Sequence, residues 1–113
     1  KVPKAIQMKF EEMIKLALGI RQKYKNLEKN EFGESWDGKD LTLGFMGDVG
    51  DLAKLIAAKE GKRSVEDVDE KLAHELSDCL WAVIVLADNY GVNMESAFVK
   101  TMNELNQRFE ESV

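Results

Sequence analysis

The sequence has one cysteine, one proline and no apolar run near the roughly 20 residues that a membrane-spanning helix needs. The lone Cys79 excludes an internal disulfide bond and a cysteine-rich zinc site, and it fits a reducing compartment. Basic residues are in the minority, with 16 Lys and Arg against 21 Asp and Glu. The resulting net charge of -5 disfavours general binding to nucleic acid or to an anionic membrane. Because the first residues show no signal-peptide pattern, we expect a cytoplasmic protein.

Histidine is equally scarce, since His74 is the only one. It does not follow a glutamate at the spacing used by di-iron carboxylate bundles, so a histidine-based metal site is not predicted. A surface position is the better expectation for His74. The chain does have enough apolar material for a core: 44% of its 113 residues are hydrophobic. This length and composition predict one domain, residues 1–113.

Apolar residues recur every three or four positions along most of the chain, which is the period of an α-helix. No stretch alternates with the period of a β-strand. We predict helices over about 2–29, 40–60 and 69–90, the last preceded by a helical turn from Ser64, and a fourth helix capped by Asn93. The polar segment 30–39 is predicted to be a loop. The fold class is therefore all-α, a four-helix bundle or a dimer-forming relative of one.

Local signals predict where these helices begin and end. Asp40 is a candidate N-cap of the second helix, and Gly61 and Gly91 follow the second and third helices. The fourth helix is predicted to turn its apolar residues inward; these are Met94, Phe98, Met102, Leu105 and Phe109. The third helix is apolar on every side over 79–87, which predicts a central position. Together with the long apolar stripe of the first helix, this surface could exceed what four helices bury internally.

Acidic residues interrupt the apolar face of the second helix. The stripe of that helix runs through Leu41, Phe45, position 48, Leu52 and Leu55, and position 48 is Asp. Asp51 lies three residues further on, about 5–6 Å away between Cβ atoms in a helix. Two ionised carboxylates at that distance repel by about 3 kcal/mol at an effective dielectric constant near 20. Some other charge must offset this repulsion.

The third helix repeats the arrangement with Glu75 and Asp78, again three residues apart at the edge of an apolar stripe. Adjacent antiparallel helices would bring both pairs together. A hard divalent cation with oxygen ligands resolves the conflict, and Mg²⁺ is the usual choice. The alternative is that each pair forms an ordinary solvated edge.

Three glycines, Gly44, Gly47 and Gly50, lie around the first acid pair. Each weakens a helix interior by roughly 1 kcal/mol relative to alanine. Their absent side chains leave room either for a ligand or for a closely packed helix, and the sequence does not decide between the two.

These motifs resemble the MazG-like branch of the all-α nucleoside triphosphate pyrophosphohydrolases, a superfamily that also contains dimeric dUTPases and phosphoribosyl-ATP pyrophosphohydrolase. The family pattern is E-x-x-E on one helix and E-x-x-D on the next. The matching segments here are Asp48-Val-Gly-Asp51 and Glu75-Leu-Ser-Asp78. The ending Lys100-Thr-Met-Asn103-Glu-Leu-Asn106-Gln-Arg-Phe is also similar to the family. The resemblance covers roughly residues 36–110.

The resemblance implies hydrolysis of a nucleoside triphosphate between its α and β phosphates, giving a monophosphate and pyrophosphate. The four acids would bind Mg²⁺, or Mn²⁺ in its place, and one carboxylate, Asp51 or Glu75, would activate water. Lys100, with Asn103 or Asn106, would contact phosphate oxygens. Family members usually assemble, which implies a homodimer or homotetramer with a nucleotide as the substrate.

Two departures from the family pattern leave a second interpretation open. Both acids of the first motif are Asp instead of Glu, and Gly47 occupies a position where the family often has a third Glu. The same changes are expected in a degenerate or non-catalytic helical module that acts in assembly or regulation.

Trp36, in the loop before the second helix, is a candidate for stacking on the base of the nucleotide. The alternative is that its indole covers the end of the core.

Overall fold

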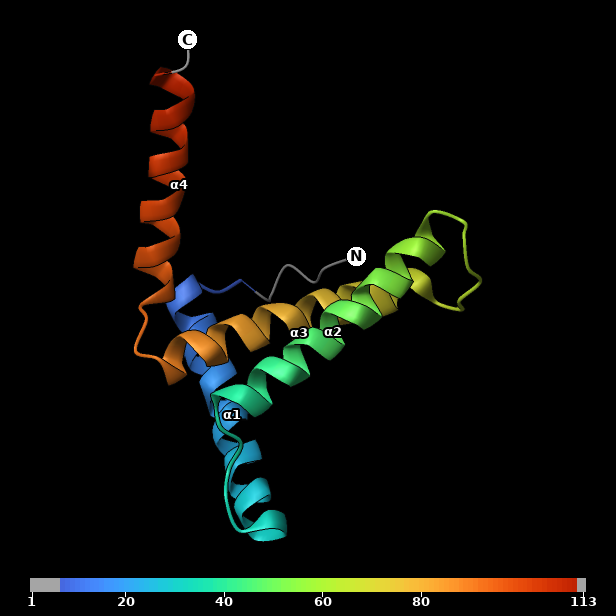
Figure 1. Ribbon diagram of the computed structural model, residues 1–113, viewed down its shortest axis with the longest axis vertical. Coiled ribbons are helices and arrows are strands. Elements are labelled where there is room, and N and C mark those ends of the chain that lie inside the picture. The colour runs from blue at the N-terminus through green and yellow to red at the C-terminus, as the bar shows by residue number, and fades with distance from the viewer. Residues whose placement is uncertain (1–6, 112–113) are drawn as a thin grey trace.

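The computed structural model describes residues 7–111, which form four α-helices (Figure 1). These are α1 (Phe10–Phe32), α2 (Gly38–Lys59), α3 (Val68–Asn89) and α4 (Met94–Glu111). The all-α prediction is confirmed. The predicted start of the first helix, near residue 2, lies outside the described residues, but residues 7–9 are not helical, so a continuous helix over 2–29 is wrong. Among the described residues, no helix has both the length and the hydropathy to cross a membrane.

The start of α2 is set by a reciprocal pair of aspartates. The Asp40 backbone N–H donates to the Asp37 carboxylate over 3.0 Å, and the Asp37 N–H donates back to the Asp40 carboxylate over 3.1 Å. This arrangement satisfies two N–H groups at the helix start. The N-cap is therefore Asp37, and the prediction of Asp40 was wrong by three residues because either aspartate could begin the pair.

The helices α2 and α3 form an antiparallel hairpin and make the most extensive helix–helix contact in the described chain. Gly61 and Gly91, with φ values of 83° and 67°, end the two helices in the left-handed conformation, as predicted. Asn93 also caps α4 as predicted, accepting a hydrogen bond from the Ser96 N–H over 3.0 Å. At the open end of the hairpin, Gly38 is buried so closely against Tyr90 that a Cβ atom would overlap the phenol.

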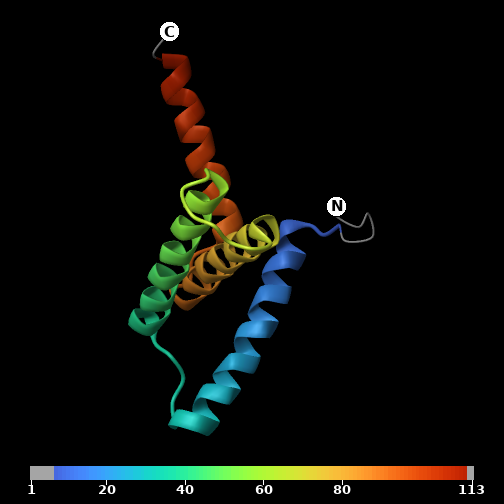
Figure 2. The ribbon, with the colours of Figure 1, turned by 90° about the vertical axis from the view of Figure 1, so that its right-hand side faces the viewer.

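The helix α1 packs across α3 (Figure 2). The indole N–H of Trp81 donates to the carbonyl of Ala17 over 3.0 Å, and the Trp81 ring lies 5.8 Å from the ring of Tyr24. Trp81 therefore fixes the crossing point of the two helices.

A buried ion pair ties α1 to the following loop. The guanidinium of Arg21 donates to the carboxylate of Glu28 over 2.7 and 3.2 Å, and their side chains are only 4% and 9% exposed. Both residues also hold the backbone of Trp36, through its N–H and its carbonyl. This network sets the position from which α2 starts.

The four helices do not close around a common core within one chain. Buried apolar residues are few and mostly small; they are Ala17, Leu55, Ala82, Ile84, Val85 and Ala87. The Cα radius of gyration is 17.3 Å, against about 13 Å for a compact domain of this length. Figure 1 shows the reason: α4 projects away from the other helices. The expectation that Phe98, Met102, Leu105 and Phe109 turn inward is wrong within one chain, because they are 57%, 37%, 39% and 75% exposed.

Candidate metal centre

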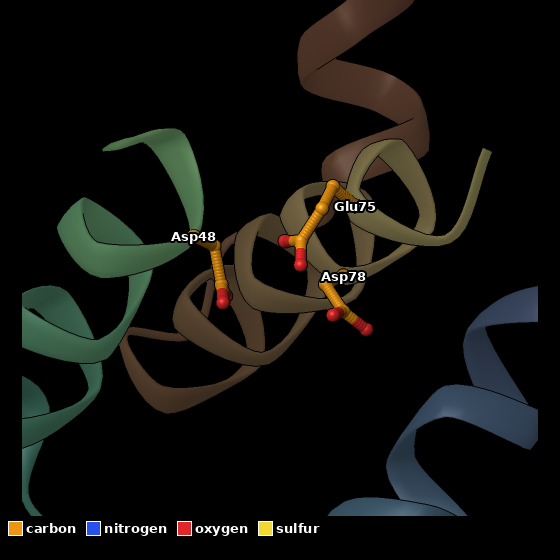
Figure 3. Close-up of side chains that lie close together, drawn as sticks. All are labelled: Asp48, Glu75 and Asp78. Atoms are coloured by element: carbon orange, nitrogen blue, oxygen red, sulfur yellow. The ribbon is translucent and has the colours of Figure 1, made fainter. Parts of the chain in front are cut away.

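Three carboxylates from two helices converge in the middle of the hairpin. Asp48 of α2 and Glu75 and Asp78 of α3 each offer an oxygen atom, and these three atoms lie within 4.8 Å of one another. Figure 3 shows the three side chains projecting into the same space. All three residues are half-buried. Of the four predicted acidic ligands, the fold therefore brings three together.

The antiparallel hairpin explains this convergence. Asp48 lies near the middle of α2 on the side that faces α3, and the middle of α3 lies opposite it. Glu75 and Asp78 are three residues apart, so they occupy one side of α3. Neither flanking glycine is needed for helix packing here, since a Cβ atom at Gly47 or Gly50 would meet nothing within 4 Å.

Among the described residues, the ion pair that involves this group joins Asp78 to His74, which is charged only when protonated. One oxygen of Glu75, Oε2, is buried and has no hydrogen-bond partner. An unsatisfied buried carboxylate oxygen is unfavourable by itself. The donor set of three carboxylates, one of them unsatisfied, therefore fits a hard divalent cation.

The electrostatics agree with this deficit of positive charge. Burial raises the pKa of Asp48, and the nearby charges of Asp78 and Asp51 raise it further. Burial also raises the pKa of Glu75, followed by the charges of Asp78, Asp51 and Asp48. Each of these carboxyl groups is thus harder to ionise than in water. A bound cation would favour the ionised forms.

Two neighbours complete the surroundings of the group. His74 is exposed, as predicted, and its Nε2 lies 3.2 Å from a carboxylate oxygen of Asp78. Cys79 is half-buried, and its pKa is raised by burial first and then by the charges of Asp48 and Glu75. A thiol with a raised pKa stays protonated, so Cys79 is a poor metal ligand.

Asp51 is exposed and lies outside the group of three. It lines an adjoining cleft of about 460 Å³ that also reaches His74 and Glu75. Three basic side chains line the same cleft: Lys54, Arg63 and Lys71. Helical spacing in the sequence could have indicated two of them, because Lys54 lies three residues after Asp51 and Lys71 lies four residues before Glu75. It gives no such indication for Arg63, which comes from the loop between α2 and α3.

A larger groove of about 930 Å³ opens on the other side of the group, between α1 and the hairpin. Asp48 and Asp78 line its edge, and Trp36 lines it as well. The Trp36 side chain is 46% exposed and lies beside Gly44, with 3.7 Å between its ring and a Cβ atom built there. Trp36 therefore shares a groove with two of the three acids.

The remaining predicted residues lie elsewhere in the chain. Lys100, Asn103 and Asn106 line a hollow on α4 that none of the four acids borders. Lys100 is 3.5 Å from Glu104 on its own helix. One chain thus does not bring these residues next to the carboxylates, and their role stays a prediction.

Residues 38–113 match the family model of the MazG nucleotide pyrophosphohydrolase domain. The chain belongs to this family. The match begins at the first residue of α2, so it contains both carboxylate-bearing helices and the basic loop, while α1 lies before it.

The chain is similar to the uncharacterized protein YvdC of Bacillus subtilis (strain 168). It is 32% identical over 82 residues, with 65% of this chain and 77% of the relative covered. No solved structure matches the chain.

Proposed function

We propose that this protein is a Mg²⁺-dependent nucleoside triphosphate pyrophosphohydrolase, with Mn²⁺ as a substitute ion. The reaction would split the bond between the α and β phosphates and release a nucleoside monophosphate and pyrophosphate. One observation carries the proposal: in a MazG domain, three carboxylates from facing helices converge around a buried oxygen that lacks a partner. Such a group is unfavourable for stability alone, and a site that receives a cation explains it.

Asp48, Glu75 and Asp78 are the residues proposed to hold the ion. When bound, the ion supplies positive charge that offsets the phosphates and the developing charge of the transition state. Asp51 lies at the edge of the group, exposed and outside the three converging oxygens. This position suits a general base for the attacking water, and Glu75 is the second candidate. The water oxygen bonds to the α phosphorus, its proton passes to the carboxylate, and pyrophosphate leaves with the bridging oxygen.

The cleft beside Asp51 is the proposed place of the leaving phosphates. Its basic residues Lys54, Arg63 and Lys71 form no ion pair with any residue that the structure describes. Unpaired cations next to the carboxylate group are suited to phosphate oxygens. The cleft also contains Asp67 and Glu70, so its own charge is mixed, and the contribution of each basic residue is expected to be modest.

The nucleoside is proposed to occupy the groove on the other side of the carboxylates. Trp36 lies there with an exposed indole, which suits stacking on a base. In this arrangement the carboxylates lie between the nucleoside and the leaving phosphates, as cleavage at the α phosphate requires.

The alternative, a non-catalytic helical module, is favoured by one observation. Asp51 does not join the other three acids, so the ligand set is smaller than the family pattern implies. This alternative predicts stability that does not respond to divalent metal ions, and no hydrolysis.

A panel of nucleoside triphosphates, assayed for pyrophosphate with Mg²⁺ or Mn²⁺, tests the proposal. We expect release from at least one nucleotide, and a fall of at least about 100-fold in Glu75→Gln, which removes a charge at the centre of the site. Glu60→Gln, at the exposed end of α2, is the matched control and should keep full activity. No release from any nucleotide would contradict the proposal, as would unchanged activity of Glu75→Gln.

A further inference from the structure

Trp36 lies between two helices, yet side chains of another element hold its backbone in place. The Trp36 N–H donates to the Glu28 carboxylate over 2.7 Å, and the Trp36 carbonyl accepts from the Arg21 guanidinium over 3.3 Å. The next N–H along the chain, that of Asp37, donates to the Asp40 carboxylate over 3.1 Å. Three successive polar groups of the backbone are therefore paired. A loop residue that is fixed in this way loses little conformational freedom when a ligand binds to it.

The buried Arg21–Glu28 pair does more than stabilise the fold. The loss of water around two buried charges offsets much of their attraction, so apolar side chains of similar size often stabilise such positions equally well. The buried Nε of Arg21 also lacks a hydrogen-bond partner, which is a further cost. What apolar side chains could not supply is direction. A guanidinium and a carboxylate can bind each other and still make further hydrogen bonds, and both of them use this capacity on Trp36.

The fixed backbone places the Trp36 indole in the groove that Asp48 and Asp78 border. The nearest part of α2 is Gly44, one helical turn before Asp48. The indole is therefore separated from the carboxylate group by about 6 Å along α2 at 1.5 Å per residue. With a base stacked on the ring and the α phosphate at the carboxylates, the sugar would span this interval.

We propose that Arg21 and Glu28 are positioning residues for nucleoside binding and that they act through Trp36. The inference rests on the proposed function. All three residues precede the segment 38–113 that matches the family model, whereas the four acids lie within that segment. The two tasks are thus separated along the chain: the family segment carries the carboxylates, and α1 with its loop determines how firmly the nucleoside is bound. Because every base has a face that can stack, loosening the ring should weaken different nucleotides by similar factors.

Steady-state kinetics of Arg21→Lys test the role of the pair. Lysine keeps the positive charge beside Glu28, but its ammonium lacks the planar set of donors that binds the carboxylate and the Trp36 carbonyl together. We expect KM for the nucleotide to rise about 5-fold with kcat unchanged, because the carboxylates are untouched. A purely structural role would instead lower kcat, through loss of folded enzyme, and leave KM as it is. That result, or unchanged kinetics, would overturn the proposal. Lys23→Arg, the reverse exchange at an exposed position of α1, is the control and should change neither constant.

A double-mutant cycle tests whether the pair acts through the indole. Trp36→Ala alone should raise KM about 10-fold, which is within the range for one base stacked on an aromatic ring. If Arg21 acts by holding that ring, adding Arg21→Lys to Trp36→Ala should raise KM no further. Trp36→Phe keeps a stacking face, so it should restore part of the affinity and the sensitivity to Arg21→Lys. If the two effects multiplied in the Trp36→Ala background, Arg21 would act by another route and the proposal would be wrong.

A measurement without nucleotide examines the positioning itself. Glu28→Asp keeps the charge but shortens the side chain that accepts the Trp36 N–H. Hydrogen exchange at the Trp36 amide, followed by nuclear magnetic resonance, should become at least about 5-fold faster in this variant. The amides in the middle of α3 should keep their wild-type rates, which shows that the rest of the fold is intact. Unchanged exchange at Trp36 would mean that the pair does not hold the loop.

Binding of analogues that cannot be hydrolysed separates this inference from the proposed function. Calorimetric titration with α,β-methylene analogues of a purine and a pyrimidine nucleoside triphosphate, in the presence of Mg²⁺, gives the dissociation constants. We expect Arg21→Lys to bind both about 5-fold more weakly than the wild type. If the wild type hydrolyses no nucleotide but binds the analogues with this dependence on Arg21, the proposed function fails and the inference stands. If the wild type is active and Arg21→Lys binds as tightly, the inference alone fails. A wild type that neither hydrolyses nucleotides nor binds the analogues would contradict both.

Discussion

The molecule buries charge in two places, and the two are built differently. Arg21 and Glu28 form a pair of opposite charges with both carboxylate oxygens hydrogen-bonded. Burial would raise the pKa of Glu28, but the hydrogen bonds from Arg21 and Trp36 and the charges of Arg21 and Lys25 together lower it. The opposite charges of the pair thus balance within the chain, although the buried Nε of Arg21 has no hydrogen-bond partner.

The carboxylate group on α2 and α3 has the opposite character. Its members carry the same charge, burial and then the neighbouring carboxylates raise the pKa of Asp48 and Glu75, and one oxygen of Glu75 has no partner. The first arrangement stabilises the fold, whereas the second opposes it unless a cation offsets its charge. The comparison separates a structural site from a proposed functional one on electrostatic grounds.

The largest effect is expected from breaking the Arg21–Glu28 pair. Glu28→Gln leaves the Arg21 charge buried without its partner and should lower the free energy of unfolding by about 3–5 kcal/mol. Urea denaturation measures this loss. Because the pKa of Glu28 is lowered in the fold, its stabilisation is present above the ordinary carboxyl pKa and is lost as the pH falls through the lowered value. Glu31→Gln, exposed one turn later, should change stability little.

Removing a charge from the carboxylate group on α2 and α3 should raise the stability of the metal-free protein instead of lowering it. Asp48→Asn removes one of several repelling charges, so the metal-free protein should gain about 1 kcal/mol of unfolding free energy, the order of a Coulomb interaction between two unit charges 4 Å apart in water. Its melting temperature should no longer rise with Mg²⁺. Thermal unfolding with and without Mg²⁺ measures both effects, and Asp88→Asn, exposed near the end of α3, is the control. A destabilised metal-free Asp48→Asn would contradict this account.

The stability of the metal-free protein should also depend on pH in a specific direction. Raised pKa values mean that the folded state holds protons that the unfolded state has lost. The contribution of Asp48 and Glu75 therefore falls as the pH rises from their ordinary pKa to their raised pKa. The increase in melting temperature caused by Mg²⁺ should grow over the same range, since the ion binds the ionised group. If Mg²⁺ raised the melting temperature equally below and above this pH range, the prediction would be refuted.

The smallest effect concerns the basic cleft. Arg63→Gln should raise the KM for the nucleotide by about 3-fold, in line with an exposed charge contact below 1 kcal/mol. The rate at saturating nucleotide should change less. Lys62→Gln removes the same charge from the neighbouring position, which does not line the cleft, and should leave KM unchanged. If both variants raised KM equally, the basic residues would attract the nucleotide only through their general charge and not through contacts in the cleft.

The hairpin and its acids could be predicted from the sequence because their signals are local. Glycines and caps limit α2 and α3, and an acid within an apolar stripe, as at Asp48, marks the side that faces the partner helix. Asp51 shows the limit of this reasoning: a spacing of three residues predicts a shared side of the helix, yet Asp51 is exposed and lies outside the group.

Features that depend on distant parts of the chain could not be predicted. The period of α4 indicates an amphipathic helix but does not say what covers it. Arg21 and Glu28 are two turns apart, a common spacing on solvated helices, and only the returning loop at Trp36 buries them. Arg63 reaches its cleft through a loop whose path no periodic signal describes.

The tight approach of Gly38 to Tyr90 has a consequence for the geometry of the site. The contact acts as a stop at one end of the hairpin, and Asp48 lies about 15 Å further along α2 at 1.5 Å per residue. A side chain at position 38 would overlap the Tyr90 phenol, so either that exposed ring or α2 would have to shift, and a shift of α2 would disturb the alignment of the carboxylates without touching them. The alignment of the ligands thus depends in part on a side chain that is missing nearly three helical turns away.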